Sequence, residues 1–133
     1  MRLRGRTVPE SARRAAIFLG GGRIAFGAVM VLAPNTFLSV ARTPVDQINS
    51  SSRLLTRMTG VRDMLLGANL LRHLDDRDAL RRAALLNAAA DGGDTVALTA
   101  SAREEGFFVA GASGVPVAAS ACAGFIGLAK SLD

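Results

Sequence analysis

Apolar residues are concentrated in four long stretches of the chain, at about residues 15–33, 54–71, 83–102 and 107–128. An α-helix rises 1.5 Å per residue, so about twenty residues suffice to cross the hydrocarbon core of a bilayer. The first and last stretches have no polar face at helical period, which a helix on the surface of a soluble protein normally shows. The pattern predicts four membrane-spanning helices.

The polar positions between the stretches carry helix start and stop signals. Pro34 closes the first stretch, and Asn49 or Ser50 is suited to cap the second helix. Asp76 or Asp78 is suited to cap the third. The first three predicted helices therefore each have a boundary signal in the sequence.

The connections themselves predict the topology. Residues 34–52 form a polar loop, residues 72–82 a charged turn and residues 103–106 a third tight turn. Short connections imply antiparallel neighbours. The predicted fold is all-α: residues 1–133 form a single membrane domain, an antiparallel bundle of four transmembrane helices.

Basic residues are distributed unevenly between the two ends of this bundle. Ten of the 16 Lys and Arg residues lie in the N-terminal segment, the 72–82 turn and the C-terminus, whereas only Arg42 and Arg103 lie on the opposite side. The positive-inside rule then places both termini in the cytoplasm.

Three alternative interpretations of the sequence are disfavoured: a soluble bundle, a cleaved signal peptide and a nucleic-acid-binding protein. A soluble helical bundle fits the modest mean hydropathy of +0.30, but so small a chain cannot bury two helices that are apolar all round. A cleaved signal peptide would have a shorter apolar run and an A-x-A-like site. The net charge of +5 suggests nucleic acid, yet no aromatic residues interleave the arginines, so no nucleic-acid partner is expected.

Charged residues inside the apolar stretches are the most informative feature of the sequence. An unpaired charge in hydrocarbon is costly, so such residues usually face a bundle interior and pair with one another. Three are basic and three are acidic, which predicts a neutral polar core if all lie at comparable depth. They are Arg23, Arg57, Arg62, Asp63, Asp91 and Asp94.

Helical spacing groups these residues on shared faces. Asn87, Asp91 and Asp94 lie at i, i+4 and i+7 of the third stretch, which adds Asn87 to the candidates. The remaining two faces combine charges with small residues. They are Gly20, Arg23, Gly27 and Met30 in the first stretch, and Arg53, Arg57, Gly60, Met64 and Gly67 in the second.

Two interpretations of this cluster stay open. In the first, the charges pair with one another and fix the register of the helices. The equal numbers of positive and negative charges favour this interpretation. In the second, the cluster is a polar pocket for a small polar or anionic ligand, or a proton relay in which an Asp titrates. The sequence assigns no catalytic residue.

No metal or cofactor site is expected. The run Asp75–Asp78 alternates with Arg in a predicted turn and reads as a solvated capping loop, and Gly20–Gly22 lacks the spacing of a phosphate-binding loop. Cys122 is the only cysteine and has no partner for redox or zinc chemistry, which indicates a structural thiol.

Small residues recur every four positions in the last stretch, which Pro116 is expected to kink. Such a ridge lets helices approach closely in lipid. It predicts packing within the bundle, or else contact with a membrane-protein partner or a second copy of the chain. The ridge consists of Gly106, Ala110, Gly114, Ala118 and Cys122.

The order of these motifs resembles that of small bacterial four-helix membrane proteins of unknown function, similar to DoxX-like proteins. The likeness covers about residues 15–128, and its most distinctive part is the R-x-x-G-x-R-D-x-x-x-G run over residues 57–67. The series of matching motifs starts with the Gly22-Arg23 pair and ends with Asp91-Gly92-Gly93-Asp94. The resemblance implies a multi-pass protein of the inner (plasma) membrane. DoxX-like proteins are linked to quinone-associated or oxidative-stress complexes, so it implies no firm activity.

Two functions follow as hypotheses. The first is a non-enzymatic membrane protein, an accessory subunit or small-ligand binder, with the lipid bilayer and a membrane-protein partner around it. The alternative is a membrane enzyme or proton-coupled carrier that uses the same charged cluster.

Overall fold

The computed structural model describes residues 7–104 and 108–133, and side chains are described for 7–100 and 115–133. All regular structure within these ranges is helical, which confirms the predicted all-α class. The elements, in chain order, are α1 (Glu10–Leu32), α2 (Pro34–Val40), a 3₁₀ turn (Val45–Gln47), α3 (Ser50–Arg72), α4 (Arg77–Glu104) and α5 (Phe108–Lys130).

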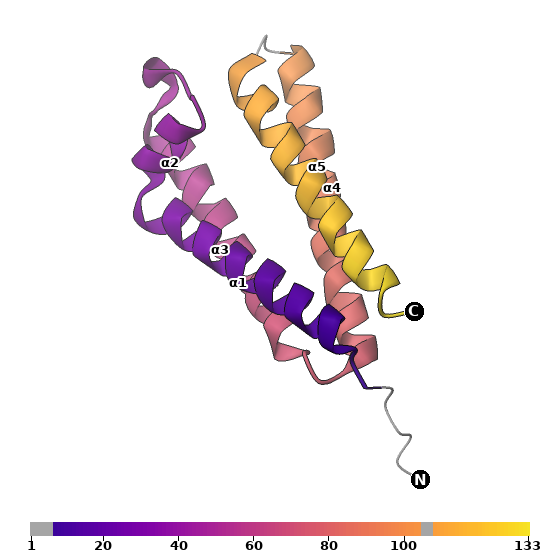
Figure 1. Cartoon of the computed structure of the whole chain (residues 1–133). Coiled ribbons are helices and arrows are strands. Elements are labelled where there is room, and N and C mark those ends of the chain that lie inside the picture. Colours follow the sequence, from indigo (N-terminus) through magenta and orange to yellow (C-terminus); the bar gives the residue numbers. More distant parts are fainter. Residues whose placement is uncertain (1–6, 105–107) are drawn as a thin grey trace.

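The four long helices form two antiparallel pairs (Figure 1). α1 packs along α3 and α4 packs along α5, while contacts between the two pairs are sparse. The pairs lie close together at the end that holds both chain termini, and they diverge toward the end that holds α2. The described helices therefore form a V-shaped arrangement of two helix pairs.

Glycines bring the backbones of α1 and α3 into direct contact. A Cβ added to Gly27 would lie 2.5 Å from the Gly60 carbonyl oxygen, and one added to Gly60 would lie 2.6 Å from the Gly27 oxygen. Two turns away, a Cβ on Gly67 would lie 2.6 Å from the Gly20 oxygen. No larger residue fits at Gly27, Gly60 or Gly67 unless a helix backbone moves, so these glycines set the distance between α1 and α3.

An apolar core fills the end of the molecule where the termini lie. Leu70 of α3 and Leu80 of α4 are completely buried there, and Phe125 of α5 is 2% exposed. Alanines of α1 and α4 pack between these larger side chains. The same end is closed by a hydrogen bond from Arg77 Nε to the Leu132 carbonyl, 2.7 Å long.

Two predicted helix caps are present. The Asn49 side chain accepts the backbone N–H groups of Ser51 and Ser52 at 3.0 and 3.1 Å, and the Ser52 hydroxyl accepts the Asn49 N–H at 3.0 Å. This reciprocal capping box satisfies backbone donors that the first turn of α3 cannot. Asp76 caps α4 by accepting the Ala79 N–H at 2.9 Å.

The connections are more helical than the sequence predicts. Pro34 does not only follow α1 but begins the additional helix α2, because a proline at the first helical position loses no hydrogen bond. The expected turn at 72–82 is confined to residues 73–76, since α4 begins directly after its cap at Asp76.

The third turn, expected at 103–106, is also displaced. Arg103 and Glu104 continue α4, while Glu105 and Gly106 lie outside the described residues. Pro116 lies inside α5, which continues past it.

One of the described helices, α1, is both long and apolar enough to cross a bilayer, with a mean hydropathy of 1.9 over its best window. α5 contains a shorter apolar section, Val115–Lys130. Length and composition thus allow a span at α1, and the other three spans stay predictions.

Candidate functional site

An ionic network joins α1, α3 and α4 near the middle of the helices. Its centre is Arg23 of α1, which makes a two-pronged contact with Asp91 of α4. Arg23 Nη1 donates to Asp91 Oδ2 at 2.8 Å and Nη2 donates to Oδ1 at 2.7 Å. Both side chains are only 7% exposed. Because two parallel N–H···O bonds fix angle as well as distance, this pair sets how α1 lies against α4.

Asp63 of α3 links Arg23 to a second arginine. Its Oδ1 accepts from Arg23 Nη2 at 3.0 Å and from Arg62 Nη2 at 3.2 Å. Arg62 in turn holds Asp94 of α4 through both terminal nitrogens, with Nη1 at 2.8 Å from Oδ1. The described network therefore runs Asp91–Arg23–Asp63–Arg62–Asp94, and α4 contributes both of its ends.

The two ends of the network differ in exposure. The Arg23–Asp91 end is buried, whereas the side chains of Arg62 and Asp94 are 39% and 34% exposed. The outer pair is therefore accessible from outside the protein, whereas the inner pair is not. The inner pair carries the larger penalty when a partner is removed, because the charge left behind stays buried.

The local sequence explains why these side chains meet. Arg23 lies between Gly20 and Gly27 on the buried face of α1, and Asp63 lies between Gly60 and Gly67 on the buried face of α3. The glycine contacts bring the two backbones together on both sides of the charged pair, so Arg23 and Asp63 are directly opposed.

Two further groups complete the interior and were not both foreseen. The Phe125 ring of α5 lies 5.4 Å from the Arg23 guanidinium carbon, within range of a cation–π contact. Asn87 is completely buried, and its Nδ2 donates to the Ala83 carbonyl at 2.9 Å. Sequence spacing placed Asn87 on this face, whereas nothing in it indicated that α5 would cover Arg23 with an aromatic ring.

Three buried polar atoms in or beside the network have no hydrogen-bond partner among the described residues: Asn87 Oδ1, Arg23 Nε and Arg62 Nε. The Asn87 amide cannot simply be reversed, because its Nδ2 faces the carbonyl oxygens of Ala83 and Leu66. The network and its surroundings therefore have one free acceptor and two free donors for a water molecule or a small polar ligand.

Arg57 does not belong to the network. It is exposed, and its Nε donates to the Val31 carbonyl at 3.3 Å. The buried face of α3 contains Gly60 and Gly67 as predicted, but it continues through Thr56 and Asp63 rather than through Arg57 and Met64. The expected balance of three Arg and three Asp is therefore wrong: two guanidinium groups meet three carboxylates, which leaves one formal negative charge.

The rest of the described molecule offers no competing centre. No group of three or more His, Cys, Asp or Glu side chains in the searched part could hold a metal ion. The Cys122 thiol is partly buried and donates to the Ala88 carbonyl at 3.3 Å. The described part of the small-residue ridge thus packs against α4, while Gly106, Ala110 and Gly114 lie outside the described side chains.

Open cavities lie along the junction of α3 and α4. The larger has a volume of about 520 Å³ and is lined mainly by apolar side chains together with Arg62. A smaller one of about 180 Å³ lies toward the 73–76 turn and includes His73 and Arg82. The exposed end of the ionic network therefore borders the larger cavity.

Comparisons with protein-family models, with curated proteins and with solved structures found no match.

Proposed function

We propose that this chain is a four-span protein of the bacterial inner membrane with both termini in the cytoplasm. In it, the Arg/Asp network joins two helix pairs, and the protein acts as an accessory subunit or small-ligand binder rather than as an enzyme. One observation carries the proposal: Arg23, Asp63 and Asp91 are buried, while large apolar side chains on the same helices are exposed.

The contrast is large on single helices. On α1, Arg23 is 8% exposed, whereas Phe18 is 80% and Leu32 is 82% exposed. On α4, Asp91 is 5% exposed while Val96 is 71% exposed. Soluble monomers rarely expose large contiguous apolar patches, and intramembrane charges face the bundle interior. Lipid is the solvent that suits both features.

The pairing of the charges supports an accessory or binding role. Each of the three aspartates accepts at least one hydrogen bond from an arginine. Such mutual pairing holds the three helices together. The free atoms of Asn87 and Arg23 provide the polar contacts that a small ligand would use.

Kinship with DoxX-like proteins is part of the proposal. The motif residues of the distinctive run have structural tasks here: Gly60 and Gly67 contact α1, and Arg62 and Asp63 belong to the network. A relative would need the same residues to build the same helix contact.

A proton-coupled carrier is the second candidate, because the network contains one carboxylate more than it has guanidinium groups. Asp63 Oδ2 accepts no hydrogen bond from the described residues. Asp63 is therefore the carboxylate of the network with an oxygen free to take part in a relay. Proton flux in vesicles that is lost in Asp63→Asn would favour this candidate over the first.

Cysteine labelling tests the membrane proposal. After Cys122→Ser, single cysteines are introduced at Val45, which is 87% exposed before α3, and at the exposed Asp75 between α3 and α4. We expect a membrane-impermeant maleimide to label Val45→Cys in intact spheroplasts and Asp75→Cys only after permeabilisation. Release of the chain from membranes by carbonate, or labelling of both sites in intact cells, would refute the proposal.

A further inference from the structure

We propose that the junction of α3 and α4 binds one anionic phospholipid, with its phosphate at Arg82 and an acyl chain along the apolar cavity. The inference rests on the proposed membrane location. It identifies the chemistry of a ligand that neither the ionic network nor the helix topology specifies.

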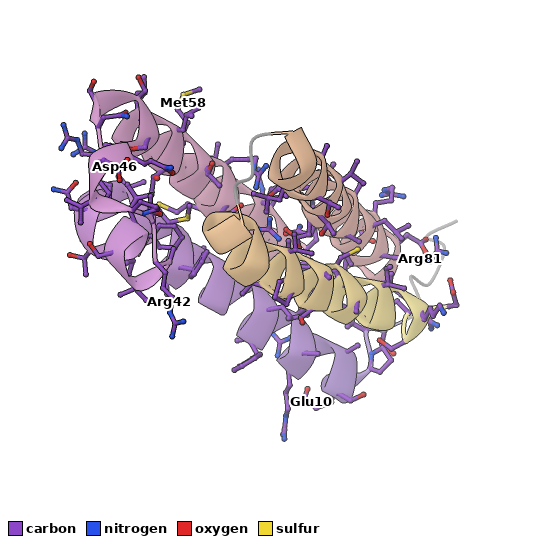
Figure 2. The ribbon with its side chains drawn as sticks, turned by 90° about the horizontal axis from the view of Figure 1, so that it is seen from above. Glu10, Arg42, Asp46, Met58 and Arg81 are labelled. Carbon is purple, nitrogen blue, oxygen red and sulfur yellow. The ribbon has the colours of Figure 1, made fainter. Side chains whose placement is uncertain are left out.

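The two cavities form one continuous groove. Asn69 of α3 and Leu86 of α4 line both of them, so the smaller cavity leads directly into the larger. The smaller one holds the polar side chains of the groove, with His73, Arg82 and Asn69 in its lining beside alanines and Leu86. The larger is apolar and is lined by leucines of both helices and by Met58, which projects outward from α3 (Figure 2).

Charge complementarity selects an anionic headgroup. Arg82 is exposed and forms no ion pair or hydrogen bond with the described residues, unlike Arg81 beside it, which pairs with Asp133 at 2.6 Å. The amide of Asn69 likewise has no described partner. Arginine matches the geometry of phosphate oxygens, and an amide supplies a neutral donor beside it.

The length of the groove matches one leaflet. From His73 to Arg62 the rise along α3 is about 16 Å, close to half of the roughly 30 Å hydrocarbon core. The polar end lies beside the 73–76 turn, at the basic end that the positive-inside rule assigns to the cytoplasm. Anionic lipids are enriched in that leaflet. An acyl chain entering there would end near Arg62.

The absence of Trp and Tyr from the sequence makes the test simple, because one introduced Trp is the only strong fluorophore. The full chain is reconstituted in phosphatidylcholine vesicles carrying increasing fractions of brominated phosphatidylglycerol or brominated phosphatidylcholine. Leu65→Trp reports from the groove, and Phe18→Trp reports from the exposed surface of α1.

At position 65 we expect brominated phosphatidylglycerol to quench at a roughly fivefold lower mole fraction than brominated phosphatidylcholine, the effect of about one basic residue near an anionic surface. At position 18 the two lipids should quench equally. Arg82→Gln in the Leu65→Trp background should abolish the preference. Arg14→Gln, at the same end but outside the groove lining, should leave it unchanged, and circular dichroism verifies the helix content of every variant.

The outcomes separate the two proposals. Absence of quenching at position 18 by either lipid would refute the membrane location and this site with it. Quenching at position 18 without a phosphatidylglycerol preference at position 65 would refute the lipid site alone. The same holds if position 65 is shielded from both lipids, as a bound helix would shield it, or if the preference persists in Arg82→Gln.

Discussion

The interior of this molecule is built in two different ways. At the end with the termini, Leu70, Leu80 and Phe125 form an apolar core from many weak contacts. Farther along the helices, Arg23 and Asp91 join the two helix pairs by directed hydrogen bonds. The first design uses the exclusion of water, and the second uses the high cost of an unpaired charge.

In the proposed membrane, each design lies where its driving force is strong. The apolar core lies beside the polar turn at 73–76, where water is close and burial of leucine is favourable. Deeper in lipid, apolar contacts between helices gain little over contacts with acyl chains, whereas polar pairs lack competition from water. Removing one residue from each region tests this division.

The largest loss is expected from Asp91→Ala. Arg23 would keep only its bond to Asp63 in a buried site, which should cost about 3–5 kcal/mol of the free energy of unfolding. Asp94→Ala is the matched control and should cost less, because its pair is partly exposed and Arg62 keeps its bond to Asp63. Unfolding in mixed detergent micelles measures both, and equal losses would contradict the distinction between the inner and outer pairs.

Leu80→Ala comes next and tests the apolar core. The side chain is completely buried, so its truncation should cost about 3 kcal/mol. Leu54→Ala, at a residue that is 58% exposed, should change stability by less than about 0.5 kcal/mol. If the two variants are equally stable in the same assay, the core does not stabilise this end.

Gly27→Ala tests the helix contact on which the network depends. The added methyl would lie 2.5 Å from the Gly60 oxygen and force α1 and α3 apart, at a cost of about 1–3 kcal/mol. At Gly22 no atom lies within 4 Å of an added Cβ, so Gly22→Ala should be neutral or stabilising by up to about 1 kcal/mol. The melting temperature measured by circular dichroism should fall in Gly27→Ala and should stay the same or rise in Gly22→Ala.

Arg57→Ala should have the smallest effect, below about 0.5 kcal/mol, since its one described hydrogen bond is exposed. The melting temperature of this variant in detergent should equal that of the wild type. A loss as large as that of Asp91→Ala would show that Arg57 belongs to the polar core after all.

Helical spacing predicted the buried face of α1 well: Gly20, Arg23, Gly27 and Met30 are all buried. On α3 the predicted face shares Gly60 and Gly67 with the buried face, but it contains Arg57 where the structure buries Thr56. Small and polar residues lie on several faces of this helix, so its sequence alone does not fix which face is buried. The packing against α1 fixes it.

Other features depend on contacts between distant segments. The cap at Asn49 is local and was predictable, whereas Phe125 reaches Arg23 only because α5 packs beside α1. The additional helix α2 begins at Pro34, which the sequence pattern indicates only as the end of the first helix. A proline can both follow one helix and start the next.

The sequence separation within the network has a consequence for synthesis. Arg23 is 40 residues before Asp63 and 68 residues before Asp91. At typical translation rates Asp63 is made roughly 2–8 s after Arg23. In the proposed membrane, we expect α1 to insert with an uncompensated charge, to gain Asp63 as its first partner through the glycine contact with α3, and to receive Asp91 last. The order in which the helices are synthesised thereby becomes the order in which the charge of Arg23 is neutralised.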